Sequence, residues 1–151
     1  MPVIDIVYTD SSHLDFQLLS SLLEKELYTR DGDLADINLE LNKIDFLPHV
    51  VLLYAENTAA ACGAFSEYNE NAVEVKRMYV LPLHRRKNLA SRVLSELEHL
   101  AKKERYNYCL LETGKNQPEA IAFYRKHGYA QIQNFGKYMG SINSVCFRKQ
   151  L

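Results

Sequence analysis

The residues with the clearest capacity for chemistry lie between Glu74 and Ala90. A β-type run stops at Pro82, a short basic turn follows, and an amphipathic helix begins directly after that turn. Helix N-termini bind phosphates because their first amides lack intrahelical partners and the positive end of the helix dipole lies there. The segment therefore predicts a docking site for a phosphorylated ligand. Charge alone would also fit a solvated basic turn, but the flanking strand and helix favour the binding site.

Composition limits the class of protein. The chain has 151 residues, of which 47% are apolar and 25% charged, and its net charge is −1; we expect one domain over residues 1–151. Without an excess of positive charge, nucleic acid is not an expected partner, and any phosphate binding has to be local. The apolar runs are too short for a membrane span, and acids stand where a signal peptide would be basic, so we expect a cytoplasmic protein without membrane contact.

The three cysteines, Cys62, Cys109 and Cys146, are widely spaced and form no CxxC pair. We therefore expect buried reduced thiols, which suit a reducing compartment, and no disulfide. The five histidines show no ligand spacing either, so no metal is expected.

The elements that position the basic turn follow from periodicity. Residues 3–8 predict a strand, and leucines at helical spacing predict a helix over 14–27 that is capped near Asp10 and ends near Gly32. Residues 31–45 are rich in acids and predict a short helix or a loop. Their acidic face could attract a cationic amine or could simply be solvated.

The rest of the chain predicts a mixed sheet. Strands are expected at 50–55, 61–67, 73–81, 108–112, 129–133 and 144–149, with helices at 86–105 and from about 116 to Gly128. The strand, helix and strand over 73–112 form a βαβ unit, which requires a parallel, right-handed crossover. The predicted fold class is α+β: a single mixed sheet, antiparallel on the N-terminal side, flanked by helices.

Taken together, these elements and motifs resemble the GNAT acetyltransferase superfamily. Arg85, Asn88 and Ala90 stand where that family has Arg/Gln-x-x-Gly-x-Gly/Ala at a helix start. Residues 112–114 and the run Phe123-Tyr124-x-x-x-Gly128-Tyr129 are similar to later family elements. Asn88 departs from the family's glycine, although Asn is among the residues most tolerant of unusual backbone angles.

The resemblance implies acetyl-CoA, or another acyl-CoA, as donor substrate. The pyrophosphate would be held by the turn and helix start, and the pantetheine arm would pair with the backbone of the preceding strand. The implied turn residues are Arg85, Arg86, Lys87, Asn88, Leu89 and Ala90, and the strand residues are Met78, Tyr79 and Val80. Asn116 could cap its helix or contact the coenzyme, and Arg125 and Lys126 could reach the 3′-phosphate.

Two side chains resemble catalytic residues of the family. Glu74 is similar to the glutamate that deprotonates the acceptor amine, and Glu67 or Glu112 could face the same gap instead. Tyr124 is similar to the tyrosine that protonates the departing thiolate. The plainer alternatives are a strand glutamate that pairs with Lys76 and a core aromatic beside Phe123.

The resulting prediction is an N-acetyltransferase that moves an acetyl group directly to a primary amine of a small molecule, as a monomer or homodimer. Gly136, Tyr138 and Gly140 suggest a flexible late loop that could cover the acceptor or mediate a dimer. Two alternatives remain open. One is a non-catalytic acyl-CoA-binding module; the other is a nucleotide-binding protein, which ranks last because GxxxxGK[ST] and GxGxxG are both missing.

Overall fold

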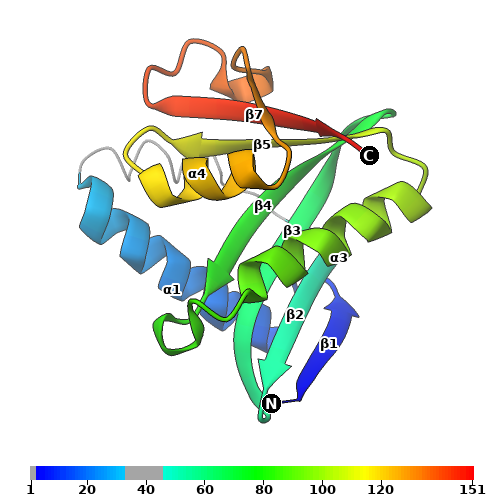
Figure 1. Cartoon of the computed structure of the whole chain (residues 1–151), viewed down its shortest axis with the longest axis vertical. Coiled ribbons are helices and arrows are strands. Elements are labelled where there is room, and N and C mark those ends of the chain that lie inside the picture. The colour runs from blue at the N-terminus through cyan, green and yellow to red at the C-terminus, as the bar shows by residue number, and fades with distance from the viewer. Residues whose placement is uncertain (1–2, 33–45) are drawn as a thin grey trace.

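The computed structural model describes residues 3–32 and 46–151 (Figure 1). Its single sheet has seven strands in the order β1-β2-β3-β4-β5-β7-β6. Among the described strands, β4 and β5 pair in parallel and every other neighbouring pair is antiparallel. The strands are β1 (Ile4–Thr9), β2 (His49–Ala55), β3 (Thr58–Asn69), β4 (Ala72–Val80), β5 (Tyr108–Gly114), β6 (Ala130–Ile132) and β7 (Ser144–Gln150). The predicted mixed α+β sheet is confirmed.

Helices cover both faces of the sheet. Helix α3 (Leu89–Lys103) packs on β2, β3 and β4, and α1 (Leu14–Asp31) packs on β3 and β4. Alternation along β2 sends Val51 and Leu53 into the α3 core and Val50 and Leu52 into the α1 core, so this strand is almost wholly buried. None of the helices among the described residues is both long and apolar enough to cross a membrane.

Gly63 sets how closely α3 approaches the sheet. A Cβ at this position would lie 2.6 Å from Met78 Sδ, 2.6 Å from Val93 Cγ1 and 2.9 Å from Leu97 Cδ1. These separations are below van der Waals contact, so only glycine lets α3 lie this near to β3 and β4.

Helix ends differ in detail from the prediction. The N-cap of α1 is His13, whose Nδ1 accepts from the Asp15 amide at 3.1 Å, because Asp10 instead accepts from the Ser12 amide at 2.8 Å. The helix ends where predicted, with the Gly32 amide donating to the Tyr28 carbonyl. The acidic segment 31–45 lies, from residue 33 onward, outside the described residues.

Helix α3 begins three residues later than predicted. Arg86 and Asn88 have φ of 64° and 62°, and left-handed residues cannot continue a right-handed helix. The chain therefore leaves β4 through a 3₁₀ turn (Pro82–His84) and a tight turn over residues 85–88. Helix α4 (Pro118–Lys126), which follows β5, stops before Gly128 as predicted. Gly128 has φ of 89°.

Strands β4 and β5 separate after four residue pairs. Their ladder runs from Ala72–Tyr108 to Val75–Leu111 and goes no further. A bulge at Arg77, with φ of 59°, shifts the register of β4 against β3 and turns the end of β4 away. Figure 1 shows β4 leaving β5 at a wide angle, while β5 continues beside β7.

The segment around Tyr138 is anchored, in contrast to the predicted flexible loop. The Tyr138 side chain is fully buried in a 3₁₀ turn (Gly136–Tyr138). Asn134 Nδ2 donates to the carbonyls of Tyr138 and Ser141 at 3.1 and 2.9 Å. These contacts hold the chain between β6 and β7 against the sheet.

Candidate active site

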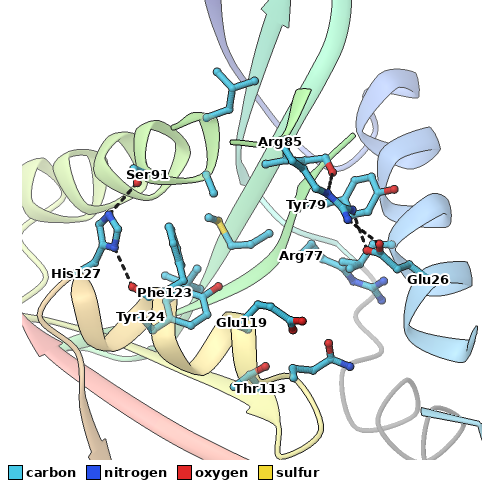
Figure 2. Close-up of a pocket in the computed structure, with 18 of the residues that line it drawn as sticks. Glu26, Arg77, Tyr79, Arg85, Ser91, Thr113, Glu119, Phe123, Tyr124 and His127 are labelled. Atoms are coloured by element: carbon cyan, nitrogen blue, oxygen red, sulfur yellow. Dashed lines mark hydrogen bonds and ion pairs between the residues drawn. The ribbon is translucent and has the colours of Figure 1, made fainter. Parts of the chain in front are cut away.

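A cavity of about 700 Å³ occupies the place where β4 and β5 part. Its walls come from α1, the end of β4, the turn before α3, the end of β5 and α4 (Figure 2). Backbone groups of residues 76–80 that face the gap have no ladder partner on β5. Backbone groups must find hydrogen-bond partners, so this edge suits an extended ligand that carries amides.

The turn residues form one end of the cavity. Arg86, Asn88, Leu89, Ala90 and Ser91 line it, whereas Lys87 is exposed and is not among the lining residues. The side chain of Asn88 makes no capping bond to α3. The first amides of α3 are therefore not occupied by their own cap and lie at the cavity, as an anion site requires.

Arg85 also lines the cavity, and its side chain has several partners within the protein. Its guanidinium pairs with Glu26 of α1, its Nε donates to the Val80 carbonyl at 2.9 Å, and it lies 5.5 Å from the centre of the Tyr79 ring. The hydrogen bond to Glu26 raises the pKa of Arg85 further above its ordinary value. Arg85 therefore ties α1 to the end of β4.

The predicted strand residues all line the cavity. Met78 and Val80 pack toward α3, whereas Tyr79 lies in the core on the α1 side, beside Cys62. Burial raises the pKa of Tyr79. On the opposite wall, β5 contributes Glu112, Thr113 and Gly114.

Tyr124 lies on the wall formed by α4. Its side chain is buried, it lines the cavity, and burial raises the pKa of its phenol. Edge contacts with Phe123 and Tyr129, at centroid distances of 5.2 and 5.7 Å, hold the ring in place. Figure 2 shows the ring of Tyr124 among the side chains that line the cavity.

Asn116 lies outside the cavity, and its predicted capping role is wrong. The N-cap of α4 is Gln117, which makes no side-chain capping bond; Gln117 is buried and lines the cavity, whereas Asn116 is exposed. Of the two candidate cations on α4, Lys126 lines the cavity, while Arg125 donates to Gln131 at 2.8 Å.

The three candidate carboxylates have different surroundings. Glu74 is buried but is not among the lining residues; it accepts from Tyr138 Oη at 2.5 Å and pairs with Lys76 Nζ at 3.2 Å. Glu112 lines the cavity and accepts from Ser144 Oγ at 2.6 Å. Glu67 is exposed and accepts from Tyr106 at 2.6 Å, away from the cavity.

Lys76 connects the buried Glu74 to the cavity. It lines the cavity and is 7% exposed. Burial, opposed by the charge of Glu74, lowers the pKa of Lys76 to about 8. Sequence reasoning treated Lys76 only as a surface partner of Glu74, because burial of a strand lysine depends on what covers that face.

The sequence profile of the Acetyltransferase (GNAT) family matches residues 16–129. The chain belongs to this family. It is 40% identical over 95 residues to an IAA acetyltransferase of Azospirillum brasilense, and the match covers 62% of this chain and 62% of that protein. The chain thus spans less than two thirds of that relative's length.

Solved structures agree with the GNAT assignment. A candidate acyl-CoA N-acyltransferase from Klebsiella pneumoniae superimposes with a TM-score of 0.80 at 28% identity, over 100% of this chain and 98% of that one. A GNAT acetyltransferase from Elizabethkingia anophelis, solved with acetyl-CoA bound, has a TM-score of 0.67 at 17% identity, over 98% of each chain. The second likeness shows the shared fold.

Two histidines of this GNAT chain line the cavity and were not singled out as binding residues from sequence. His127 contacts Ser91 Oγ through Nε2 and the Phe123 carbonyl through Nδ1, each at 2.8 Å. Among the described residues, the buried Nδ1 of His84 has no hydrogen-bond partner in the protein. Proximity of His84 to the turn was visible in sequence, but the partner of His127 lies 36 residues away along the chain.

The cysteines lie apart from this chemistry. All three are buried and free, and none is among the lining residues. Burial raises the pKa of Cys62 and Cys109 to about 12 and that of Cys146 to about 11, so these thiols stay protonated. No three His, Cys, Asp or Glu side chains gather as metal ligands within residues 3–32 and 46–151.

Proposed function

We propose that this GNAT protein transfers an acetyl group from acetyl-CoA to the primary amine of a small molecule. The observation that carries the proposal is the open gap between β4 and β5, which leads directly to the left-handed turn and the start of α3. The neighbour from E. anophelis, which holds acetyl-CoA, and the acetyltransferase name of the A. brasilense relative support this donor.

The residues present fit an acyl-CoA. Arg86 and Lys126 supply positive charge at the cavity, and amides of residues 88–91 supply donors for a diphosphate. His84 Nδ1, buried without a protein partner, offers a further polar contact. The free edge of β4 offers backbone groups to the amides of a pantetheine arm. When bound, the thioester supplies the acetyl group.

The reaction also needs two proton transfers: one removes a proton from the acceptor amine, and the other protonates the departing thiolate. An amine with pKa near 10.4 costs about 4.6 kcal/mol to deprotonate at pH 7, so a carboxylate base lowers the barrier. Glu112 is the better placed base because it lines the cavity, and Glu74 would act through Lys76 or through water. Tyr124 would donate its phenolic proton to the departing thiolate, since a tyrosine phenol is protonated at neutral pH.

Direct transfer suits the side chains around the cavity. A covalent acyl-enzyme would need an activated nucleophile. No cysteine is among the lining residues, and Ser91, whose hydroxyl contacts His127, lies at the start of α3, where the diphosphate rather than the thioester is proposed to bind. The buried reduced thiols are also the reason to place the reaction in the cytoplasm.

The test is calorimetric binding of acetyl-CoA, followed by thiol release across a panel of amino acids, polyamines and aminoglycosides. We expect binding, and turnover with at least one amine. Binding without turnover on any amine would favour the alternative of a non-catalytic acyl-CoA module. Stabilisation by ATP or NAD but not by acetyl-CoA would refute the proposal; a ligand at a hundred times its Kd stabilises by about 2.7 kcal/mol.

A charge-reversal pair locates the site. Arg86→Glu should weaken acetyl-CoA binding at least about tenfold, because it replaces attraction to the diphosphate with repulsion. Lys103→Glu makes the same change at the exposed far end of α3 and should leave the affinity unchanged. Equal affinities of the two variants for acetyl-CoA would mean that the turn is not part of the binding site.

A further inference from the structure

The imidazole of His127 bridges the end of α4 and the start of α3. Its Nδ1 lies 2.8 Å from the Phe123 carbonyl one turn back on α4, and its Nε2 lies 2.8 Å from Ser91 Oγ in the first turn of α3. Figure 2 shows both contacts as dashed lines, of which the one to Ser91 crosses from the end of α4 to α3. His127 and Ser91 both line the cavity.

The two contacts assign the proton on the ring. A carbonyl oxygen only accepts, so Nδ1 must carry a hydrogen and donate it to Phe123. In the neutral ring Nε2 is then an acceptor, and the Ser91 hydroxyl donates to it. Ser91 has a single hydroxyl hydrogen, and this contact uses it.

A diphosphate at the start of α3 competes for that hydrogen. Phosphate oxygens only accept at neutral pH, so Ser91 cannot donate to a phosphate and to a neutral His127 at once. Both bonds become possible if Nε2 is protonated, because Nε2–H then donates to Ser91 Oγ and the hydroxyl hydrogen turns to the phosphate. No covalent bond changes, and the proton comes from solvent.

We propose that His127 takes up a proton when the coenzyme binds and so positions the Ser91 hydroxyl to donate to the diphosphate. The inference rests on the proposed function, which places the diphosphate at the start of α3. His127 is therefore a positioning residue that acts through Ser91.

Charged groups of both signs lie around the bridge. Arg86 from the turn and Lys126 from α4 line the same cavity, and Lys149 of β7 lies beside Gly128, where it pairs with Glu98 at 3.0 Å. A diphosphate at the start of α3 would add negative charge beside the ring, and nearby negative charge favours the charged imidazole in the complex.

Proton uptake makes affinity depend on pH. Where the complex holds more protons than its separated components, affinity falls as pH rises, by at most about tenfold per pH unit for one proton. Histidine is the side chain that changes charge within the physiological range. The dependence should therefore appear between about pH 6 and 8.

The test uses 3′-dephospho-CoA, which keeps the diphosphate but lacks the 3′-phosphate monoester that itself titrates near pH 6. Calorimetry in two buffers of different ionisation enthalpy gives the number of protons taken up. We expect roughly half a proton per ligand near pH 7, and binding about threefold to tenfold weaker at pH 8 than at pH 6.5. His127→Gln should lose the uptake, and Ser91→Ala should reduce it.

The control is His99→Gln, an exposed histidine on α3 that does not line the cavity, and it should keep the uptake. Uptake that is absent in the wild type, or unchanged in His127→Gln or in Ser91→Ala, would overturn the inference and leave the proposed function standing. No binding of either acetyl-CoA or 3′-dephospho-CoA would overturn both.

Discussion

Arg85 and Glu26 form a two-point ion pair, with Nη1–Oε1 at 2.9 Å and Nη2–Oε2 at 3.0 Å. The pair joins the turn before α3 to the helix that forms the opposite wall of the cavity (Figure 2). A guanidinium held by two parallel bonds has a fixed direction. Arg85 thus ties α1 to the cavity wall, whereas Arg86 and Lys126, which also line the cavity, would face the proposed diphosphate.

A double-mutant cycle on Arg85→Ala and Glu26→Ala should give a favourable coupling. The two side chains are 40% and 32% exposed, so we expect only about 0.5 kcal/mol in the free energy of urea unfolding. The coupling should shrink at high salt, since charge attraction is its source. A coupling of zero at low salt would mean that the ion pair does not hold α1.

Asn88 should tolerate glycine but not a β-branched residue. Its φ of 62° is reached readily by Asn and Gly, whereas valine in this region is strained by about 1–2 kcal/mol. Asn88→Gly should therefore leave the free energy of unfolding within a few tenths of a kcal/mol, and Asn88→Val should lower it by about that strain. Equal stability of the two variants would contradict a left-handed residue at the N-cap of α3.

The turn was predictable because its signals are local. A strand that ends at a proline, a run of bases and an amphipathic pattern stand next to one another, so residues 74–90 alone indicate a ligand site at a helix start. The parallel crossover between β4 and β5 follows from the intervening helix for the same reason.

Partners distant in sequence were not predictable. Arg85 meets Glu26 at a separation of 59 residues, and Glu74 meets Tyr138 at 64. Whether Glu74 lines the cavity depends on the register of β4 and on the segment around Tyr138 that covers it. Charge and spacing in one sequence determine neither this register nor this covering segment. Glu74 could therefore be proposed as a candidate base, but its position relative to the cavity could not be predicted.

Tyr124→Phe should lower kcat with the best amine of the panel and leave acetyl-CoA affinity within about twofold. The phenol is removed, but the ring and its packing on Phe123 and Tyr129 remain. General acid catalysis is worth about a hundredfold or more, which sets the expected loss. Phe123→Leu is the packing control and should alter stability more than kcat. An unchanged kcat in Tyr124→Phe would remove the acid role.

Lys76 should make stability rise with pH in the alkaline range. Burial lowers its pKa from an ordinary 10.5 to about 8 in the folded protein. Between these values the unfolded chain binds more protons than the folded one, so the free energy of unfolding increases with pH. Below pH 8 both states hold the proton and the contribution is flat.

The measurement is the difference in unfolding free energy between wild type and Lys76→Met across pH 7 to 10.5. Lys76→Met leaves Glu74 without its ion pair, so a constant offset is expected at every pH. The informative quantity is the slope: the wild type should gain up to about 1.4 kcal/mol per pH unit over the variant above pH 8. Lys103→Met, at an exposed lysine of α3, should show no such slope. A difference that does not change with pH would mean that the Lys76 ammonium is as well solvated in the folded protein as in the unfolded chain. Lys76 would then not link Glu74 to the cavity.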